Sequence, residues 1–447
     1  MKSRVVHDYG GPFDPNWSLE CLSRKTLARL ARESMLLSMI HNQSLIPHLA
    51  VLGGRQATIE IADAEWMGAS PIYTARNKAN LGFSGDGVPE IFKNFQFDIG
   101  APHHYLDFRF EVVDHDLGHF WLAHCGAYRY VRLVTHDDQQ SIHDMCHEME
   151  DRSFDATLGV NNPAARVTPI HRPPEPVEGP DGVPCRWVVR ITPGVSSRPD
   201  HPMLSLIRET KAAKFHFELG ESREPGGLDD YSAEFQPFLR LEDFSHAVLV
   251  RQVKEFLLDI HLLMRSGYAY IDEHYGTDLL DDLAVQDRAA MMPMAVQRLR
   301  GALNIQGDGI ESIAKLLQVH PLLPPDYVSR GVAIDGESSG RFWISECDGL
   351  TDDGTRSPLS WLHQPENPTF DALTWTVNPH AVVEPIDPSN VPEADAVVAW
   401  RFRLDPAAAS PEPPWTTAMI GIDDMATFDL SERPAVPVRL RPRTDHS

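Results

Sequence analysis

Long apolar runs and a cysteine framework are both missing from this chain of 447 residues. The longest apolar candidate, around residues 256–264, contains Asp259 and His261, so we expect no membrane partner. Five cysteines are too few to hold a chain of this length together by disulfide bonds. The first residues contain no apolar signal segment. We therefore predict a cytoplasmic protein.

Basic residues are also scarce. The chain has 40 Lys and Arg against 64 Asp and Glu, which gives a formal net charge of −24. Such a surface repels phosphate backbones, so we expect no nucleic acid partner. Hydrophobic residues make up 42% of the chain, an ordinary share for a folded globular protein, and the length allows two or three domains.

The chain does contain a long internal repeat. At a fixed offset of 222 positions, residues 81–125 align with residues 303–347 without a gap. This alignment gives 13 identities in 45 positions, where unrelated segments of average composition would give roughly 3. Both copies contain a Gly-Asp-Gly sequence, a Phe-Trp pair and a final cysteine, Cys125 in the first and Cys347 in the second. The repeat is long enough to be a whole domain, which indicates a tandem duplication.

Each copy changes its hydrophobic period partway along. Helical spacing predicts helices over 23–50, 61–81, 88–97 and 141–155 in the first copy and over 247–264 in the second, and Gly85-Asp86-Gly87 between two of these helices is expected to be a turn. Alternating spacing predicts strands over 105–113, 119–123, 166–171 and 185–191.

We therefore predict an α+β fold in which helices precede a four-stranded antiparallel sheet, and two such copies form a pseudo-twofold dimer within one chain. The expected division is an intact copy at 20–192, an insert at 193–243, a degenerate second copy at 244–405 and a C-terminal tail at 406–447.

The two copies differ in their reactive side chains. The first has many cysteines, histidines and acids, and the second has lost most of them. The members in the first copy are His103, His104, His115, His119, His124, Cys125, His143, Cys146, His147, Glu148, Asp151 and Cys185. A single working site in the first copy, supported by a degenerate second copy, would explain this difference.

Three of these cysteines are expected to meet. Cys125 ends the second predicted strand, Cys146 lies on the following helix, and Cys185 begins the fourth strand. His143, Cys146, His147 and Glu150 share one helix face. Thiolates with imidazole are ligands for zinc or iron, and a thiol beside an imidazole is also the minimum for a nucleophile, so both chemistries stay open. Cys125 and Cys146 could alternatively be small hydrophobic core residues.

Further residues near these cysteines are candidates for a substrate pocket. Trp66 with its small neighbours occurs only in the first copy, and His124 and Tyr128 flank Cys125. We expect the three to line a pocket for a small-molecule substrate, with core packing as the alternative for Trp66.

The order of these residues resembles the L-2-amino-thiazoline-4-carboxylic acid hydrolase-like family. The resemblance covers about residues 80–192 and rests on Cys125-Gly-Ala-Tyr128, Cys146 with an acidic residue after it, Asn162-Pro163, Arg172 and Cys185. It implies a cytoplasmic enzyme that opens a heterocycle or another C–N bond with water. Cys125 would be the nucleophile or a metal ligand, with Cys146 and Cys185 as its partners. His147 would be a base or the fourth ligand, and Glu148 or Asp151 would be the orienting carboxylate, with Glu150 another substitute for the family's acid.

Two further functions stay open beside this hydrolase. One is a non-catalytic protein that binds or senses a small ligand, and the other is a metal-dependent redox or oxygenase enzyme at the Cys/His site. A homodimer of the chain is compatible with each of them.

Overall fold

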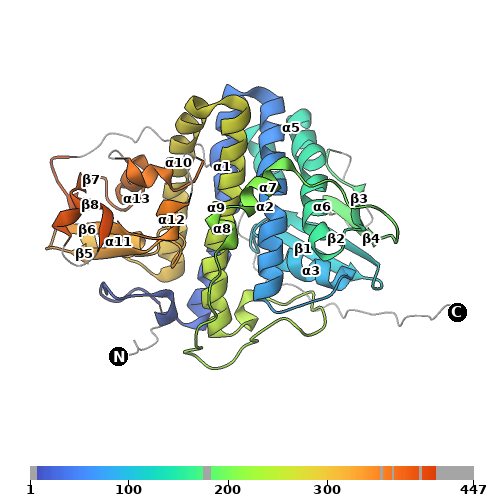
Figure 1. Cartoon of the computed structure of the whole chain (residues 1–447), viewed down its shortest axis with the longest axis horizontal. Helices are drawn as coiled ribbons and strands as arrows, with labels where there is room; N and C mark the ends of the chain where they lie inside the picture. The colour runs from blue at the N-terminus through green and yellow to red at the C-terminus, as the bar shows by residue number, and fades with distance from the viewer. Residues whose placement is uncertain (1–7, 175–182, 353–355, 365–366, 392–394, 409–447) are drawn as a thin grey trace.

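Four long helices form the centre of the molecule, and a sheet lies at each end (Figure 1). The computed structural model describes residues 8–174, 183–352, 356–364, 367–391 and 395–408. The central helices are α1 (Arg24–Leu52), α2 (Gly54–Asn80), α9 (His246–Tyr275) and α10 (Thr277–Leu303). Both sheets are four-stranded and antiparallel, so the fold is α+β. No described helix has the length and apolar content needed to cross a membrane.

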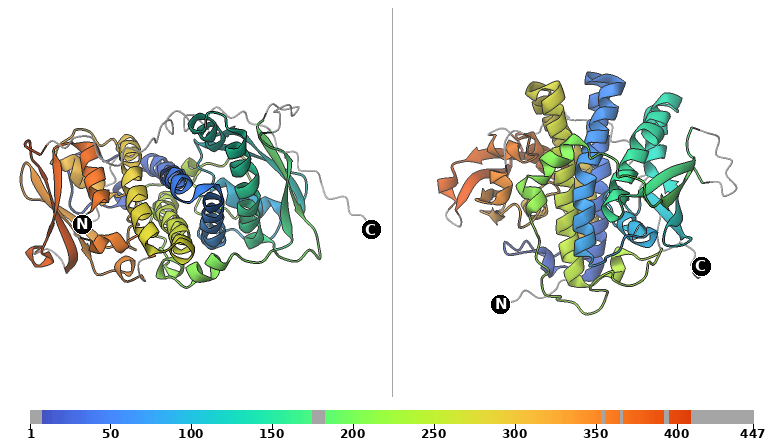
Figure 2. Two further views of the ribbon diagram at one scale, coloured as in Figure 1. Left: turned by 90° about the horizontal axis from the view of Figure 1, so that it is seen from above. Right: turned by 45° about the vertical axis from the view of Figure 1, so that its right-hand side comes forward.

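The central helices pair across the two halves of the chain. Glu33 of α1 accepts a hydrogen bond from Arg298 of α10 at 3.1 Å, and Arg76 of α2 contacts Glu255 of α9 at 2.8 Å. Residues early in one helix meet residues late in its partner, so both pairs are antiparallel. Figure 2 shows the four helices side by side between the sheets. Each half therefore buries its long helices mainly against the other half.

A buried histidine lies where the helices meet. His41 Nε2 lies 2.5 Å from Glu65 Oε1, and its Nδ1 lies 2.9 Å from Asp287 Oδ2. Tyr268 donates to Asp287 at 2.7 Å, and Asn42 donates to Glu65 at 2.9 Å. Burial opposes the charge on His41, but the two carboxylates outweigh it and raise the pKa of His41 to about 10. The histidine is therefore a cation that joins α1 to α2 and α10.

The first sheet has the strand order β1-β2-β4-β3. Its strands are β1 (Leu106–Val112), β2 (Leu117–Cys125), β3 (Ala165–His171) and β4 (Cys185–Ile191). Helices α3 (Val88–Gln96) and α6 (Glu150–Asn161) cover its inner face, where the aromatic rings of Phe92, Phe120, Phe154 and Trp187 contact one another. Alternate residues of each strand thus supply an apolar face, as the alternating spacing predicted.

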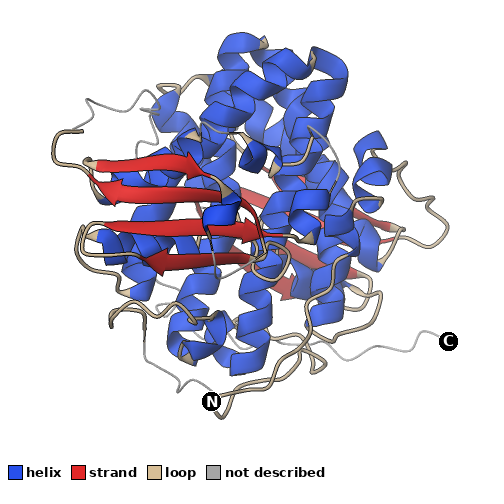
Figure 3. Ribbon diagram, turned by 60° about the vertical axis from the view of Figure 1, so that its left-hand side comes forward, coloured by secondary structure: helices blue, strands red, loops and turns tan. Residues whose placement is uncertain are grey.

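The second sheet repeats this order as β5-β6-β8-β7 (Figure 3). Its strands are β5 (Arg330–Ile334), β6 (Ser339–Ser345), β7 (Ala381–Ile386) and β8 (Ala396–Leu404). Helices α11 (Ile310–Gln318) and α13 (Pro368–Val377) cover its inner face, and Phe342, Phe370 and Trp400 form the ring contacts.

The Gly-Asp-Gly sequences are turns, as predicted. Asn162 donates a hydrogen bond to the carbonyl of Asp86 at 3.0 Å, and Asn378 does the same to Asp308 at 3.0 Å. The Asn-Pro sequence of each half therefore fastens the turn that precedes α3 or α11. These two motifs serve the scaffold.

A short arm ahead of each half packs on the other half. Tyr231 donates from its backbone to Leu81 O at 2.6 Å and from its hydroxyl to Gln96 at 2.9 Å. Tyr9, which lies 222 positions earlier, donates from its backbone to Leu303 O at 2.9 Å and from its hydroxyl to Gln318. The buried Lys93 and its counterpart Lys315 donate to backbone carbonyls of these arms. The exchange of arms is reciprocal.

Most predicted elements are present, with two differences near Cys125 and Cys146. Residues 126–134 form helix α4 (Gly126–Val134), which the sequence did not predict. The helix expected over 141–155 is divided into α5 (Gln139–His143), the π-helical turn η2 (Asp144–Met149) and α6.

Short elements complete the described chain. They are α7 (Pro202–Arg208), α8 (Lys211–Lys214) and α12 (Asp348–Thr351), with the 3₁₀ turns η1 (Leu19–Cys21), η3 (Leu241–Asp243), η4 (Ser360–His363) and η5 (Pro388–Asn390). The predicted tail falls mostly on residues 409–447, outside the described residues.

Candidate functional site

Cys125 lies at the junction between β2 and α4. Its Sγ caps the helix by accepting a hydrogen bond from the backbone N–H of Tyr128 at 3.2 Å. The next residue must be glycine, because a Cβ on Gly126 would come within 2.4 Å of the Tyr105 ring. The close approach of Tyr105 therefore fixes the start of α4 and with it the position of the Cys125 thiol.

Cys146 lies in the π-helical turn η2. The turn is anchored to α2 by Arg55, whose guanidinium binds both carboxylate oxygens of Asp144 at 2.5 and 2.6 Å. A π turn rotates the following residues relative to an uninterrupted α-helix, and such turns are frequent at functional sites. Cys146 is 4% exposed and faces the interior.

Cys185 completes a cluster of three thiols. It begins β4 opposite Leu122 of β2, three residues before Cys125 along that strand. Burial raises the pKa of Cys185, and nearby Cys125, Glu150 and Cys146 raise it further. Burial also raises the pKa of Cys125 to about 12, against the opposing hydrogen bond from Tyr128. Cys125, Cys146 and Cys185 are thus buried, neutral thiols, and Cys125 and Cys146 lie near enough to Cys185 to raise its pKa.

Glu150 is the carboxyl group beside these thiols. Part of its side chain is exposed, but burial of the carboxyl group raises the pKa of Glu150 to about 8, and the charge of Asp151 adds to this. Its charge in turn raises the pKa of Cys125, Cys146 and Cys185. The sequence signal was the shared helix face of Cys146 and Glu150, four residues apart. The sequence pattern favoured Glu148 or Asp151 and named Glu150 only as a further substitute, so it did not single out Glu150.

The other predicted catalytic side chains have partners elsewhere. His147 Nε2 lies 2.7 Å from the carbonyl oxygen of Pro173, and its ring stacks on His143 at 4.3 Å. Glu148 lies 4.0 Å from His143 on the surface side of the turn, with more than a third of its side chain exposed. Asp151 pairs with Arg172 at 2.6 Å. Arg172 lies close enough to Glu150 and Cys146 to oppose the rise in their pKa values, whereas its partner Asp151 raises the pKa of Glu150.

The predicted pocket residues are dispersed. Trp66 lies on α2 and its ring covers Gly100, where a Cβ would be 3.2 Å away, so this ring packs against the scaffold. Tyr128 contributes its backbone N–H to Cys125, while its ring lies 5.5 Å from the Arg132 guanidinium. His124 is half-buried in β2, directly before Cys125.

The second half fills the corresponding region with an ionic network. Arg265 contacts Asp352 at 2.9 Å, and Tyr327, the counterpart of Tyr105, donates to the same carboxylate. Asp352 also accepts the backbone N–H groups of Lys211 and Ala212 at 3.0 Å each, which caps α8. Cys347 is left at the start of α12 without a capping bond. This half has a structural network where the first half has thiols.

The predicted metal ligands do not have a metal-binding arrangement in the described residues. Within the described residues, no group of three His, Cys, Asp or Glu side chains is arranged to hold a metal ion. The predicted fourth ligand, His147, is oriented by Pro173. Cys125, Cys146, Cys185 and Glu150 influence one another's pKa, but in the described part of the chain they do not form such a group.

Comparison with family models, curated proteins and solved structures finds no match to this chain. The interpretation of the site therefore depends on its own geometry and chemistry.

Proposed function

We propose that Cys125, Cys146, Cys185 and Glu150 form the active site of a hydrolase that cleaves a C–N bond of a small molecule or heterocycle. One set of observations supports the proposal: the Cys125 thiol caps the start of α4, and Glu150, whose pKa is raised, lies near enough to raise the pKa of all three buried thiols. Groups with such perturbed pKa values concentrate at functional sites. The resemblance to the L-2-amino-thiazoline-4-carboxylic acid hydrolase-like family supports the same reaction class.

Cys125 is the nucleophile in this proposal. Glu150, as a carboxylate, takes the proton from the Cys125 thiol, and the thiolate is stabilised by the Tyr128 N–H at the positive end of α4. The thiolate attacks the substrate carbon and forms a C–S bond. The C–N bond then breaks, and the departing nitrogen takes the proton from Glu150.

The second half of the reaction reverses these roles. Glu150 removes a proton from a water molecule, and the resulting hydroxide attacks the same carbon. The C–S bond then breaks, and the released Cys125 thiolate takes the proton back from Glu150. Arg172, held by Asp151, keeps Glu150 from remaining fully protonated.

Metal-dependent chemistry is the second candidate, because three sulfurs are donors that zinc or iron prefer. The ligands would be Cys125, Cys146 and Cys185, with Glu150 in place of His147, and the metal would supply an activated water. Non-catalytic binding of a small ligand at the same cluster is the third.

We also infer that the chain is a tandem duplication folded as a pseudo-twofold dimer. Its support is the set of matching contacts 222 positions apart, above all the exchanged arms of Tyr9 and Tyr231. The repeat then begins near residue 8, earlier than the predicted boundary at 20, and the predicted insert 193–243 includes the second arm. The five cysteines are all free, which fits the cytoplasm. A homodimer of the whole chain is part of the same proposal.

The test compares the full chain with Cys125→Ser, Glu150→Gln and the matched control Cys347→Ser. A panel of small amidines, lactams and thiazolines is assayed, and intact-mass spectrometry detects the covalent intermediate. We expect Cys125→Ser to lower turnover at least 1,000-fold and Glu150→Gln about 100-fold, with Cys347→Ser unchanged.

Elemental analysis of the same preparations separates the alternatives. About one zinc or iron per chain, lost in the Cys125 variant, would replace the nucleophile mechanism with the metal one. Equal loss of turnover in the Cys125 and Cys347 variants would contradict a site confined to the first half.

A further inference from the structure

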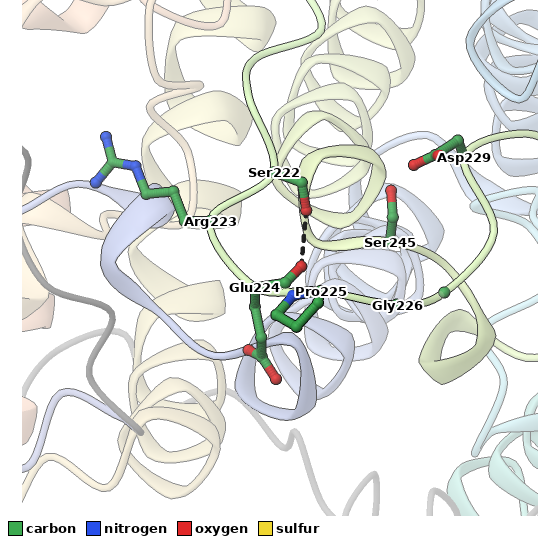
Figure 4. Close-up of a pocket in the computed structure, with 8 residues that line it drawn as sticks. Ser222, Arg223, Glu224, Pro225, Gly226, Asp229 and Ser245 are labelled. Carbon is green, nitrogen blue, oxygen red and sulfur yellow. Dashed lines mark hydrogen bonds between the residues drawn. The ribbon is translucent and has the colours of Figure 1, made fainter.

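A cavity lies at the end of the bundle where α1 and α9 begin. Its volume is 360 Å³, which is within the range of small-ligand pockets. Its wall is the loop ahead of α9, and the lining residues are Ser222, Arg223, Glu224, Pro225, Gly226, Gly227, Asp229 and Ser245 (Figure 4). None of these residues belongs to the thiol cluster.

The loop is fixed in place by its backbone. Leu228 N donates to Asp243 O and Ser245 N donates to Leu228 O, both at 2.8 Å. Gly227 has φ +87°, and a Cβ there would come within 2.4 Å of Phe244 O, so only glycine fits. The cavity therefore has a defined shape rather than being a gap beside a free loop.

The loop caps the N-terminus of α1 but not that of α9. At α1, Ser23 accepts from Thr26 N at 3.4 Å, and the Glu224 carboxylate accepts from Arg24 N at 2.7 Å. At α9, the equivalent Ser245 makes no capping bond. The start of α1 is thus occupied by a carboxylate of the protein, and the start of α9 has none.

Ser245 is the polar group without a partner at this end. It is 3% exposed, and its hydroxyl has no hydrogen-bond partner among the described residues. Figure 4 shows this hydroxyl directed into the space enclosed by the loop. An unpaired buried hydroxyl costs free energy, and the positive end of a 30-residue helix favours a negative group. Both observations indicate a ligand with a carboxylate at this point.

A simple anion would not match the rest of the cavity. Asp229 lies on the same side of the loop as Ser245 in Figure 4, and within the described residues its exposed carboxylate has no hydrogen bond or ion pair. Arg223 does not neutralise it, because its guanidinium points away from the loop interior in Figure 4. The site therefore presents a positive helix end next to an exposed, unpaired negative charge.

We propose that this cavity binds a small zwitterion, of which a free α-amino acid is the simplest. Its carboxylate would accept hydrogen bonds from Ser245 Oγ and the first N–H groups of α9. Its ammonium group would pair with Asp229. The proposal does not depend on the hydrolase reaction, because the two sites share no residue.

Isothermal titration calorimetry of the full chain tests the proposal, with glycine and L-alanine as ligands. Acetate and methylammonium serve as probes that carry only one of the two charges. We expect one saturable site for the amino acids and at least tenfold weaker binding of either half-molecule. Ser245→Ala and Asp229→Asn should each raise the Kd for glycine about tenfold or more.

The matched control is Asp230→Asn, because Asp230 lies next in the chain and bonds to Ser232 instead. This control and Cys125→Ser should both bind glycine as the unchanged protein does. Thermal unfolding shows that each variant is folded, and Ser245→Ala should keep its midpoint because its hydroxyl caps nothing. Equal affinity for acetate or phosphate, no binding of either amino acid, or loss of binding in Cys125→Ser would each overturn the proposal.

Discussion

Glu150 shows how the spacing of residues can place a side chain on the correct helix face without singling it out from its neighbours. Its position one helical turn after Cys146 predicts a shared face. That spacing does not say which of three neighbouring acids the π-helical turn will rotate inward. His147 was predicted at the site for the same reason, but the carbonyl of Pro173, from a distant segment, orients its ring. Which side chains lie beside the thiols therefore depends on contacts between distant segments, and local periodicity does not encode these contacts.

The raised pKa of Glu150 predicts a stability that depends on pH. The folded state holds this proton up to a pKa of about 8, whereas the unfolded chain releases it near the ordinary value of about 4.3. The unfolded state therefore binds fewer protons in this range, and stability falls as the pH rises towards 8.

Glu150→Gln should remove this loss, on the order of a few kcal/mol at pH 9, because the neutral amide needs no proton. Urea unfolding of both proteins at pH 5 and pH 9 measures it. Glu148→Gln is the control, since that side chain is largely exposed. An equal free energy of unfolding for Glu150→Gln and the unchanged protein at pH 9 would contradict a buried, neutral Glu150.

At the scale of elements, the period of the apolar residues was enough for the long helices and the strands of the first half. Helix α4 escaped prediction because Tyr128, Tyr130 and Val131 are residues typical of strands. The Cys125 cap and the packing of Gly126 on Tyr105 override that preference. The sequence also does not predict which helix packs against each long helix, because periodicity identifies the buried face but not the element that covers it.

The junction of α1, α2 and α10 depends on one cation. His41→Leu would leave Glu65 and Asp287 buried without their positive partner, and we expect a loss of roughly 3–5 kcal/mol in the free energy of unfolding. Chemical denaturation at pH 7 measures this, with His48→Asn, a half-buried histidine on the same helix, as the control.

The same histidine adds a dependence on pH. Its pKa is raised in the folded state, so its contribution is complete below the unfolded value of about 6.5 and is lost as the pH rises through about 10. The difference between the unchanged protein and His41→Leu should therefore shrink between pH 7 and pH 10.5. A constant difference across this range would mean that His41 is not charged.

For the whole molecule, the reciprocal contacts predict that neither half is complete alone. Cleavage at a protease site inserted after Gly194, in the exposed stretch between β4 and α7, should leave two pieces that elute together on gel filtration. The long helices of each piece remain packed against the other, an interface of the obligate kind.

Expression of residues 1–194 by themselves should in contrast give an aggregated product, because α1 and α2 would expose the faces that α10 and α9 cover. Recovery of that piece as a folded monomer with native helix content would contradict the fused-dimer description. The uncut protein carrying the inserted site is the control for the insertion itself.

The exchanged arms also determine the order in which parts of the chain can fold during synthesis. The surface of α3 stays uncovered until Tyr231 has been synthesised. Helix α1 stays uncovered until α10, which ends at Leu303, has been synthesised. A ribosome adding about 5–20 residues per second therefore exposes the thiol-bearing half for many seconds before its partners emerge. The half that contains Cys125, Cys146 and Cys185 is translated first, but its packing is complete only after the second half has been synthesised.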